Sequence, residues 1–173
     1  MKYISLFFFL VFLSCSRKSI ENLPSRKGMP DQESWGVTII LTDQGVTRAK
    51  VKSGHLQKYN DKEFILLDNN VTVDFFDELE NHTSILTSNK AEINESSNNM
   101  KAIGSVKVLS DSGITLFSEK LFWNSKDEKL FTKDSIMITT LDLDTLYGIG
   151  FESDPDLENW KILKPSGITG KEF

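Results

Sequence analysis

The feature that most constrains the fold of this chain is an internal repeat of 30 residues that aligns without a gap. ILTSNKAEIN at 85–94 aligns with TLFSEKLFWN at 115–124, and the register continues into SVKV at 105–108 and SIMI at 135–138. A further shift of the same length places TLYGIGF at 145–151 under the start of the 115–124 segment. Repetition at a fixed period is typical of stacked units in which each unit completes the core of its neighbour.

Within and around the repeat, apolar and polar residues alternate with a period of two. VTIIL at 37–41, TRAKVKS at 47–53 and VTVDF at 71–75 each place their apolar residues on one face. Such alternation is typical of β-strands with one buried face, and the segments between them are rich in Asn, Asp, Gly and Ser. The sequence therefore predicts an all-β chain, folded as an open antiparallel β-jelly roll or slab of stacked strand pairs.

The apolar alternating positions are predicted to form one inner face. These candidates are Val37, Ile39, Leu41, Ala49, Val51, Tyr59, Val71, Val73, Phe75, Leu86, Ala91, Ile93, Val106, Val108, Leu116, Leu121, Trp123, Ile136 and Ile138. Several inner positions carry small residues, namely Ala49, Ser53, Ser88, Ala91, Ser118 and Gly148. We expect these small side chains to leave space for a ligand; the alternative is the ordinary taper of a sandwich core.

The amino terminus predicts export and lipid anchoring. Residues 1–15 have one lysine, a short apolar run and the sequence LSC, which resembles a lipobox whose cysteine is acylated. Cys15 is the only cysteine, so no disulfide can form within the chain. The alternative is an ordinary signal peptide that leaves a free thiol. Residues 16–34 are polar, with two prolines, and predict a tether before a domain at 35–173.

Charge and motif content argue against nucleic-acid binding and catalysis. The chain carries 20 basic and 25 acidic residues, and no basic patch stands out. His55 and His82 are predicted to be solvated turn residues, and no familiar nucleophile, phosphate-loop or zinc motif occurs. The acidic groups near Asp142 and Asp144 and at 152–156 do not match a calcium loop and are read as turns. We therefore expect no enzyme activity, cofactor or metal.

Three segments resemble the LptC family, whose members have the LptA/LptC/OstA-like β-jelly roll. They are PDQESWGVTIILTDQGVTRAKVKSGHLQKYN at 30–60, GSVKVLSDSGITLFSEKLFWNSKDEKLFTKDSIMIT at 104–139 and TLYGIGFESDPDLENWKI at 145–162. The resemblance implies a periplasmic protein that receives lipopolysaccharide from an inner-membrane ABC transporter and passes it to an LptA-like bridge protein. The inner positions above then become candidates for a groove that holds lipid A acyl chains.

The resemblance also implies a place for each end of the slab. The first strand, near 37–41, would face the transporter, and the last strand, near 145–151, would face the bridge protein. Familiar members of the family use a transmembrane helix, whereas this chain would use lipid on Cys15. Partnership with a transporter favours the inner membrane, although Ser16 after the cysteine leaves the outer membrane open.

Two other functions remain open from the sequence. One is a free bridge module of the LptA type, which would have a cleavable signal and no lipidated cysteine. The other is a structural lipoprotein whose β-sandwich binds protein and not lipid. Lipid or protein adducts formed from inner-face positions would separate transport from a structural role.

Overall fold

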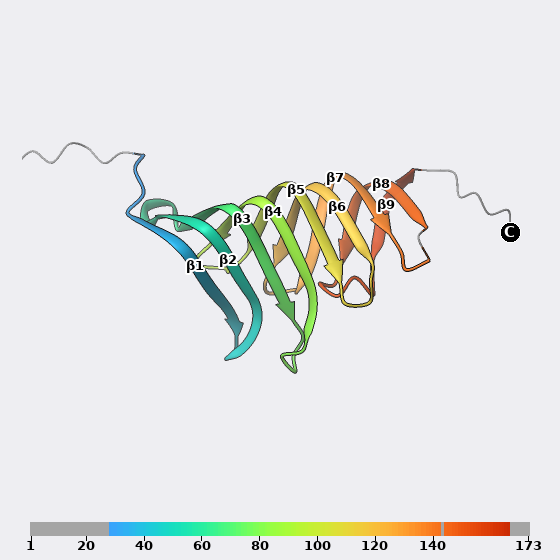
Figure 1. Cartoon of the computed structure of the whole chain (residues 1–173), viewed down its shortest axis with the longest axis horizontal. Helices are drawn as coiled ribbons and strands as arrows, with labels where there is room; N and C mark the ends of the chain where they lie inside the picture. The colour runs from blue at the N-terminus through green and yellow to red at the C-terminus, as the bar shows by residue number, and fades with distance from the viewer. Residues whose placement is uncertain (1–27, 143, 167–173) are drawn as a thin grey trace, which may run out of the picture.

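The computed structural model of the chain describes residues 28–142 and 144–166 as one antiparallel sheet whose nine strands follow sequence order (Figure 1). A short 3-10 turn, η2 (Asn60–Lys62), connects the second and third strands. The strands are β1 (Gln32–Asp43), β2 (Val46–Tyr59), β3 (Phe64–Phe76), β4 (His82–Asn94), β5 (Met100–Ser110), β6 (Thr115–Asn124), β7 (Lys129–Thr139), β8 (Thr145–Ser153) and β9 (Lys161–Ser166). The predicted all-β slab of stacked strand pairs is confirmed.

The strands are too long for a flat sheet of this size, and the sheet bends back on itself along one line. Each pairing from β2–β3 to β7–β8 has a register shift near the middle of the strands, as at Lys52/His55 and Thr87/Lys90. Shifts of this kind are β-bulges, which bend a strand and increase its twist. We call this row of shifts the fold line. The first leaf carries the β1–β2, β3–β4, β5–β6 and β7–β8 turns, and the second leaf carries the other four turns.

A recurring serine accounts for the bend in β2, β4 and β6. The hydroxyls of Ser53, Ser88 and Ser118 each donate to the carbonyl oxygen two residues further along, at 2.8, 2.9 and 2.9 Å. These bonds satisfy carbonyls that the bulge removes from the ladder. The inner serines therefore build the bend. That these three small residues also leave space for a ligand stays a prediction, and the role that their hydroxyls have in the structure is local.

The strands β3 and β5 bend by a different device. Asn69 and Asn70 of β3 have φ values of 59° and 64°, and Gly104 and Ser105 of β5 have values of 80° and 49°. Two successive left-handed residues reverse the strand locally, and Asn and Gly are the residues that tolerate this conformation best. Gly54 lies opposite Asn69, where an added Cβ would meet the Asn69 carbonyl oxygen at 2.7 Å.

The bulges also decide which residues face inward. In β2 the buried residues are Arg48, Ala49, Val51 and Ser53 before the fold line and Leu56 after it, so the alternation set by Ala49, Val51 and Ser53 shifts by one position. Tyr59 consequently points to the outer face, where its ring stacks on Phe64 with centroids 5.1 Å apart. The prediction that Tyr59 lies on the inner face is wrong, because a one-residue shift moves every later side chain to the other face.

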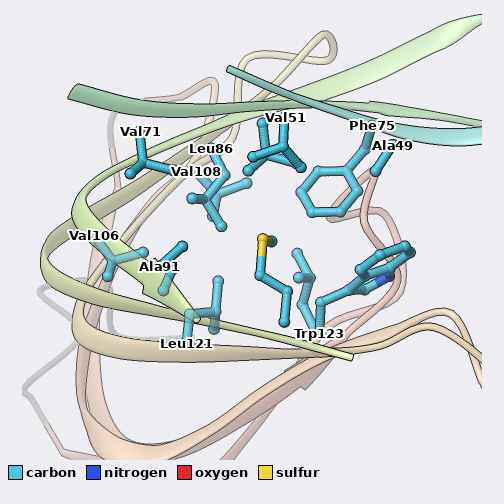
Figure 2. Packing of buried hydrophobic residues seen from close by; sticks show 14 of the residues in the cluster. Ala49, Val51, Val71, Phe75, Leu86, Ala91, Val106, Val108, Leu121 and Trp123 are labelled. Atoms are coloured by element: carbon cyan, nitrogen blue, oxygen red, sulfur yellow. The ribbon is translucent and has the colours of Figure 1, made fainter. Parts of the chain in front are cut away.

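The other predicted inner residues do face inward. Val37 and Ile39 are half-buried against the core, and the remaining sixteen lie within the buried cluster. In Figure 2, Val71, Val106 and Ala91 lie beside the bend, while Phe75 and Trp123 lie towards the opposite side. Additional core residues, which the alternation did not single out, are Leu56, Leu67, Met100, Ala102, Leu130, Phe151 and Leu157.

The ends of the sheet differ from the prediction in two places. β1 begins at Gln32, so three residues of the expected tether belong to the first strand. β8 pairs with both β7 and β9, and the terminal strand is therefore β9. The prediction of 145–151 as the last strand is wrong. β9 contains Pro165, which is acceptable on an edge strand because no partner there needs its missing N–H. The predicted signal peptide and Cys15 lie outside the described residues.

Candidate functional site

The candidate site is the space between the two leaves, which apolar side chains of both leaves fill. Phe75 of β3 in the first leaf meets Trp123 of β6 in the second leaf edge to face, with centroids 5.4 Å apart. Leu86, Val108 and Ile138 are at most 1% exposed. An apolar ligand could enter this interior only if the leaves separate or side chains move aside, because protein cores are packed without large voids.

The side of the slab opposite the fold line is where the turn ends of the two leaves meet. We call this side the seam. A hollow of about 370 Å³ lies there, lined among others by Arg48 and Thr83 of the first leaf and by Glu128, Lys129 and Pro155 of the second. The seam is therefore the side from which a ligand would reach the interior once the leaves part.

Among the described residues, two polar contacts cross the seam. Arg48 of β2, only 9% exposed, forms an ion pair with Glu128 of the β6–β7 turn. The hydroxyl of Ser84 in β4 donates to the carbonyl oxygen of Pro155 in the β8–β9 loop. These contacts join residues 80 and 71 positions apart in the sequence. They show that the β2–β4 part of the first leaf lies over the β6–β9 part of the second.

A second ion pair lies along the second leaf at the seam. Lys129, at the start of β7, pairs with Asp154, just after β8. The hydrogen bond from Lys129 to Asp154 raises the pKa of the ammonium group, and the charges of Glu152 and Asp156 add to the effect. This pair stabilises the rim of one leaf and does not join the two leaves.

Buried polar atoms without a hydrogen-bond partner gather at the seam. Within the described part of the chain they are Arg48 Nε, Thr83 Oγ1, Trp123 Nε1 and Ser153 Oγ. Trp123, Leu130 and Ser153 form one row across β6, β7 and β8 at the turn end of the second leaf. An unpaired buried polar group costs about 1–3 kcal/mol. The closed seam therefore leaves buried polar atoms without hydrogen-bond partners, whereas the polar groups at the fold line have them.

Both histidines lie in strands, and the prediction that they are turn residues is wrong. His55 is on the outer face of β2, where its ring nitrogens lie 2.7 Å from a Glu33 oxygen and 2.9 Å from an Asp68 oxygen. These two hydrogen bonds, with Glu33 the stronger cause, raise the pKa of His55. Trp35 stacks on the His55 ring with centroids 5.4 Å apart. In residues 28–142 and 144–166, no cluster of His, Cys, Asp or Glu has the arrangement of a metal site.

An apolar hollow of about 600 Å³ on the outer face was missed from the sequence. Phe117, Met137 and Tyr147 line it, and the Lys107 ammonium lies 5.8 Å from the centre of the Phe117 ring. Phe117 and Tyr147 are 30 residues apart and occupy equivalent positions of the repeat. The repeat could therefore have indicated this outer apolar row, had the outer positions been compared as the inner ones were.

The comparisons with known proteins agree with this architecture. Across the described part of the chain, no helix has the length and hydropathy needed to cross a membrane. Among curated proteins, none matches the chain. The crystal structure of LptH, the LptA homologous periplasmic component of the conserved lipopolysaccharide transport device from Pseudomonas aeruginosa, is similar in fold. Its TM-score is 0.52 at 10% identity, covering 66% of this chain and 80% of that one.

A family model described as LptC: Lipopolysaccharide-assembly, LptC-related, matches residues 10–165, which is nearly the whole chain. The match includes all nine strands up to the last residues of β9. The chain therefore belongs to the LptC-related family of lipopolysaccharide-assembly proteins.

Proposed function

We propose that this protein is a membrane-anchored periplasmic component of the lipopolysaccharide export machinery. In this role it receives lipopolysaccharide from an inner-membrane ABC transporter and passes it to an LptA-like bridge protein. The observation that carries the proposal is a single sheet, folded over but not closed, whose two inner faces are apolar over the whole length of the slab. Membership of the LptC-related family supports the same role.

The physical task is to shield acyl chains from water while letting them move on. Each methylene kept from water is stabilised by about 0.8 kcal/mol, so a long apolar interior suffices to hold a lipid chain. Over residues 28–142 and 144–166, the inner faces are mainly aliphatic and have no ionised group near the fold line. The protein carries out no chemical step in this proposal, because the transporter supplies the energy.

The two edges of the open sheet are the proposed contacts with partners. An exposed edge offers unpaired N–H and C=O groups, to which a strand of another protein can be added. β1 would face the transporter, and β9, at the other end in Figure 1, would face the bridge protein. Photo-crosslinkers at Lys164 of β9 and Thr38 of β1 test this. We expect bridge adducts from Lys164 only, and bridge adducts from Thr38 alone would reverse the assignment.

We also propose that Cys15 holds the protein to a membrane, with the inner membrane favoured. The expected result is alkali-stable radiolabelled fatty acid on the wild-type protein and its loss in Cys15→Ala, together with release of the variant from the membrane fraction. Label retained by Cys15→Ala would contradict the anchor. Fractionation of the labelled protein distinguishes the inner from the outer membrane.

Site-specific photo-crosslinking tests the lipid-carrying interior. An azidophenylalanine at Phe75, on the inner face, should form adducts with lipopolysaccharide in cells that export it. The matched control is the same probe at Thr87, which is exposed on the outer face of β4. Protein adducts from Phe75 without lipid would favour a structural, protein-binding lipoprotein, and equal lipid adducts from both positions would place the lipid outside the slab.

A further inference from the structure

We propose that the Arg48–Glu128 ion pair is a charge clasp that holds the seam closed, and that lipid loads by parting the leaves at this clasp. The inference rests on the proposed lipid-carrying function and adds to it a route of entry and a residue pair that controls it. The interior is already filled by side chains, so some part of the slab has to open before an acyl chain can enter.

The first step of the argument is the position of the pair. Arg48 projects from the first leaf, and Glu128 lies in a turn of the second leaf. Their side chains are 10% and 34% exposed, so the pair is partly removed from water. When one partner of such a pair is removed, the other is left as a poorly solvated charge, which destabilises the contact strongly. The pair therefore joins the two leaves at the seam, where no backbone connection links them.

The second step is the charge of the two rims. The hollow at the seam is lined by two cations, Arg48 and Lys129, and by six acids. The acids are Asp77 and Glu78 on the first leaf and Asp127, Glu128, Asp154 and Asp156 on the second. Lys129 is engaged with Asp154 on its own leaf. Among the described residues of this hollow, Arg48 is thus the cation that joins two acidic rims, and without its charge the rims repel each other.

The third step is the state of the polar groups beneath the clasp. Arg48 Nε, Thr83 Oγ1 and Trp123 Nε1 are buried and have no partner in the closed form. Parting of the leaves at the seam would let water reach these atoms, and their hydration offsets part of the lost apolar contact. Opening along the fold line would instead break the serine hydrogen bonds. The seam is therefore the side at which opening requires least free energy.

The first measurement follows the seam without any lipid. Trp123 is only 2% exposed and reports on opening, provided that Trp35→Phe and Trp160→Phe remove the other two tryptophans of the full chain. Acrylamide quenching of Trp123 should rise about two- to tenfold in Arg48→Met, as expected for loss of a coupled contact. Lys52→Met is the matched control, because it removes a cation from the outer face of the same strand and should leave quenching unchanged.

A second variant keeps the test valid if Arg48→Met fails to fold. Glu128→Gln weakens the same pair from its more exposed side and should raise quenching in the same direction. The exchanged pair Arg48→Glu with Glu128→Arg should return quenching towards the wild-type value. Unchanged quenching in both single variants, or an equal rise in Lys52→Met, would overturn the clasp.

The second measurement is the rate at which purified lipopolysaccharide loads. Arg48→Met should load faster than wild type, because its leaves are no longer joined by the pair, whereas Lys52→Met should load at the wild-type rate. If the quenching changes appear but every variant loads lipopolysaccharide at the wild-type rate, the pair does not control the entry of lipid. The proposed carrier function is then unaffected. If quenching changes and no form binds lipopolysaccharide, the clasp stands and the proposed function fails.

Discussion

At the fold line, polar groups that the bend removes from the sheet find partners within a few residues. Ser53, Ser88 and Ser118 each donate to a nearby carbonyl. At the seam, by contrast, Arg48 Nε and Trp123 Nε1 are buried without partners, and the rims on both sides are acidic. A bend made within one sheet can therefore be stabilised by local, repeated contacts. The seam depends instead on a few contacts between distant parts of the chain. In this account the fold line stays intact, and the leaves part at the seam.

The largest effect is expected where apolar packing holds the seam side together. Phe75→Ala removes the ring that packs on Trp123 of the other leaf and should lower the free energy of unfolding by about 3–5 kcal/mol. Val37→Ala, at the half-buried end of the slab, is the control and should cost about 1 kcal/mol or less. Urea denaturation of both variants measures the free energy of unfolding. Equal losses of this free energy would mean that packing in the middle of the slab is no more important than packing at its end.

A smaller loss is expected from crowding the fold line. A Cβ added at Gly54 would lie 2.7 Å from the Asn69 carbonyl oxygen, so Gly54→Ala should cost about 1–3 kcal/mol through overpacking. Adding Asn69→Gly removes the second close contact, with the Asn69 Cβ at 2.8 Å, and should recover only part of the loss. Thermal unfolding of the single and double variants measures both, and a neutral Gly54→Ala would mean that the strands can separate there freely.

The serine hydrogen bonds should each contribute a modest amount. Ser88→Ala leaves the Lys90 carbonyl without its donor and should lower the unfolding free energy by about 0.5–1.5 kcal/mol. Thr87→Ala, on the exposed face of the same strand, should stay within about 0.5 kcal/mol of wild type. If urea denaturation shows that Ser88→Ala changes the free energy of unfolding as little as Thr87→Ala does, the serine hydrogen bonds do not stabilise the fold line.

The smallest effect concerns a site remote from both regions. Glu33 and Asp68 raise the pKa of His55 above its ordinary value of 6.5. Stability from this contact is fully present below pH 6.5 and is lost as the pH rises through the higher folded-state pKa. Wild type should therefore gain stability relative to His55→Gln as the pH is lowered from about 8.5 to about 6. NMR titration of the ring checks the pKa itself, and a folded value below 6.5 would reverse the sign.

The sequence predicts the fold well because the period of two and the 30-residue repeat both act locally. They identify the strands, the stacking and most of the inner face. They fail at Tyr59, because one bulged residue at Gly54 reverses the alternation and bulges have no strong local signature. They fail also at β9, which is a short edge strand of six residues that contains a proline and lacks a clear alternation.

The candidate site could be predicted only in part. Inner apolar residues follow from alternation, yet the partners across the seam do not, since Arg48 and Glu128 are 80 residues apart and belong to no shared pattern. Arg48 lies in a strand in which the next two cations, Lys50 and Lys52, lie on the outer face. Its role depends on how the bend and twist bring two leaves together, which only the three-dimensional structure shows.

The claim that lipid enters by parting the leaves is tested most directly by the distance across the seam. Spin labels at Leu79→Cys and Lys126→Cys, both exposed on opposite rims, can be placed in the full chain carrying Cys15→Ser, so that they are the only thiols. We predict that saturating lipopolysaccharide lengthens the distance between the labels measured by electron paramagnetic resonance. Bound lipopolysaccharide with an unchanged distance would contradict the account.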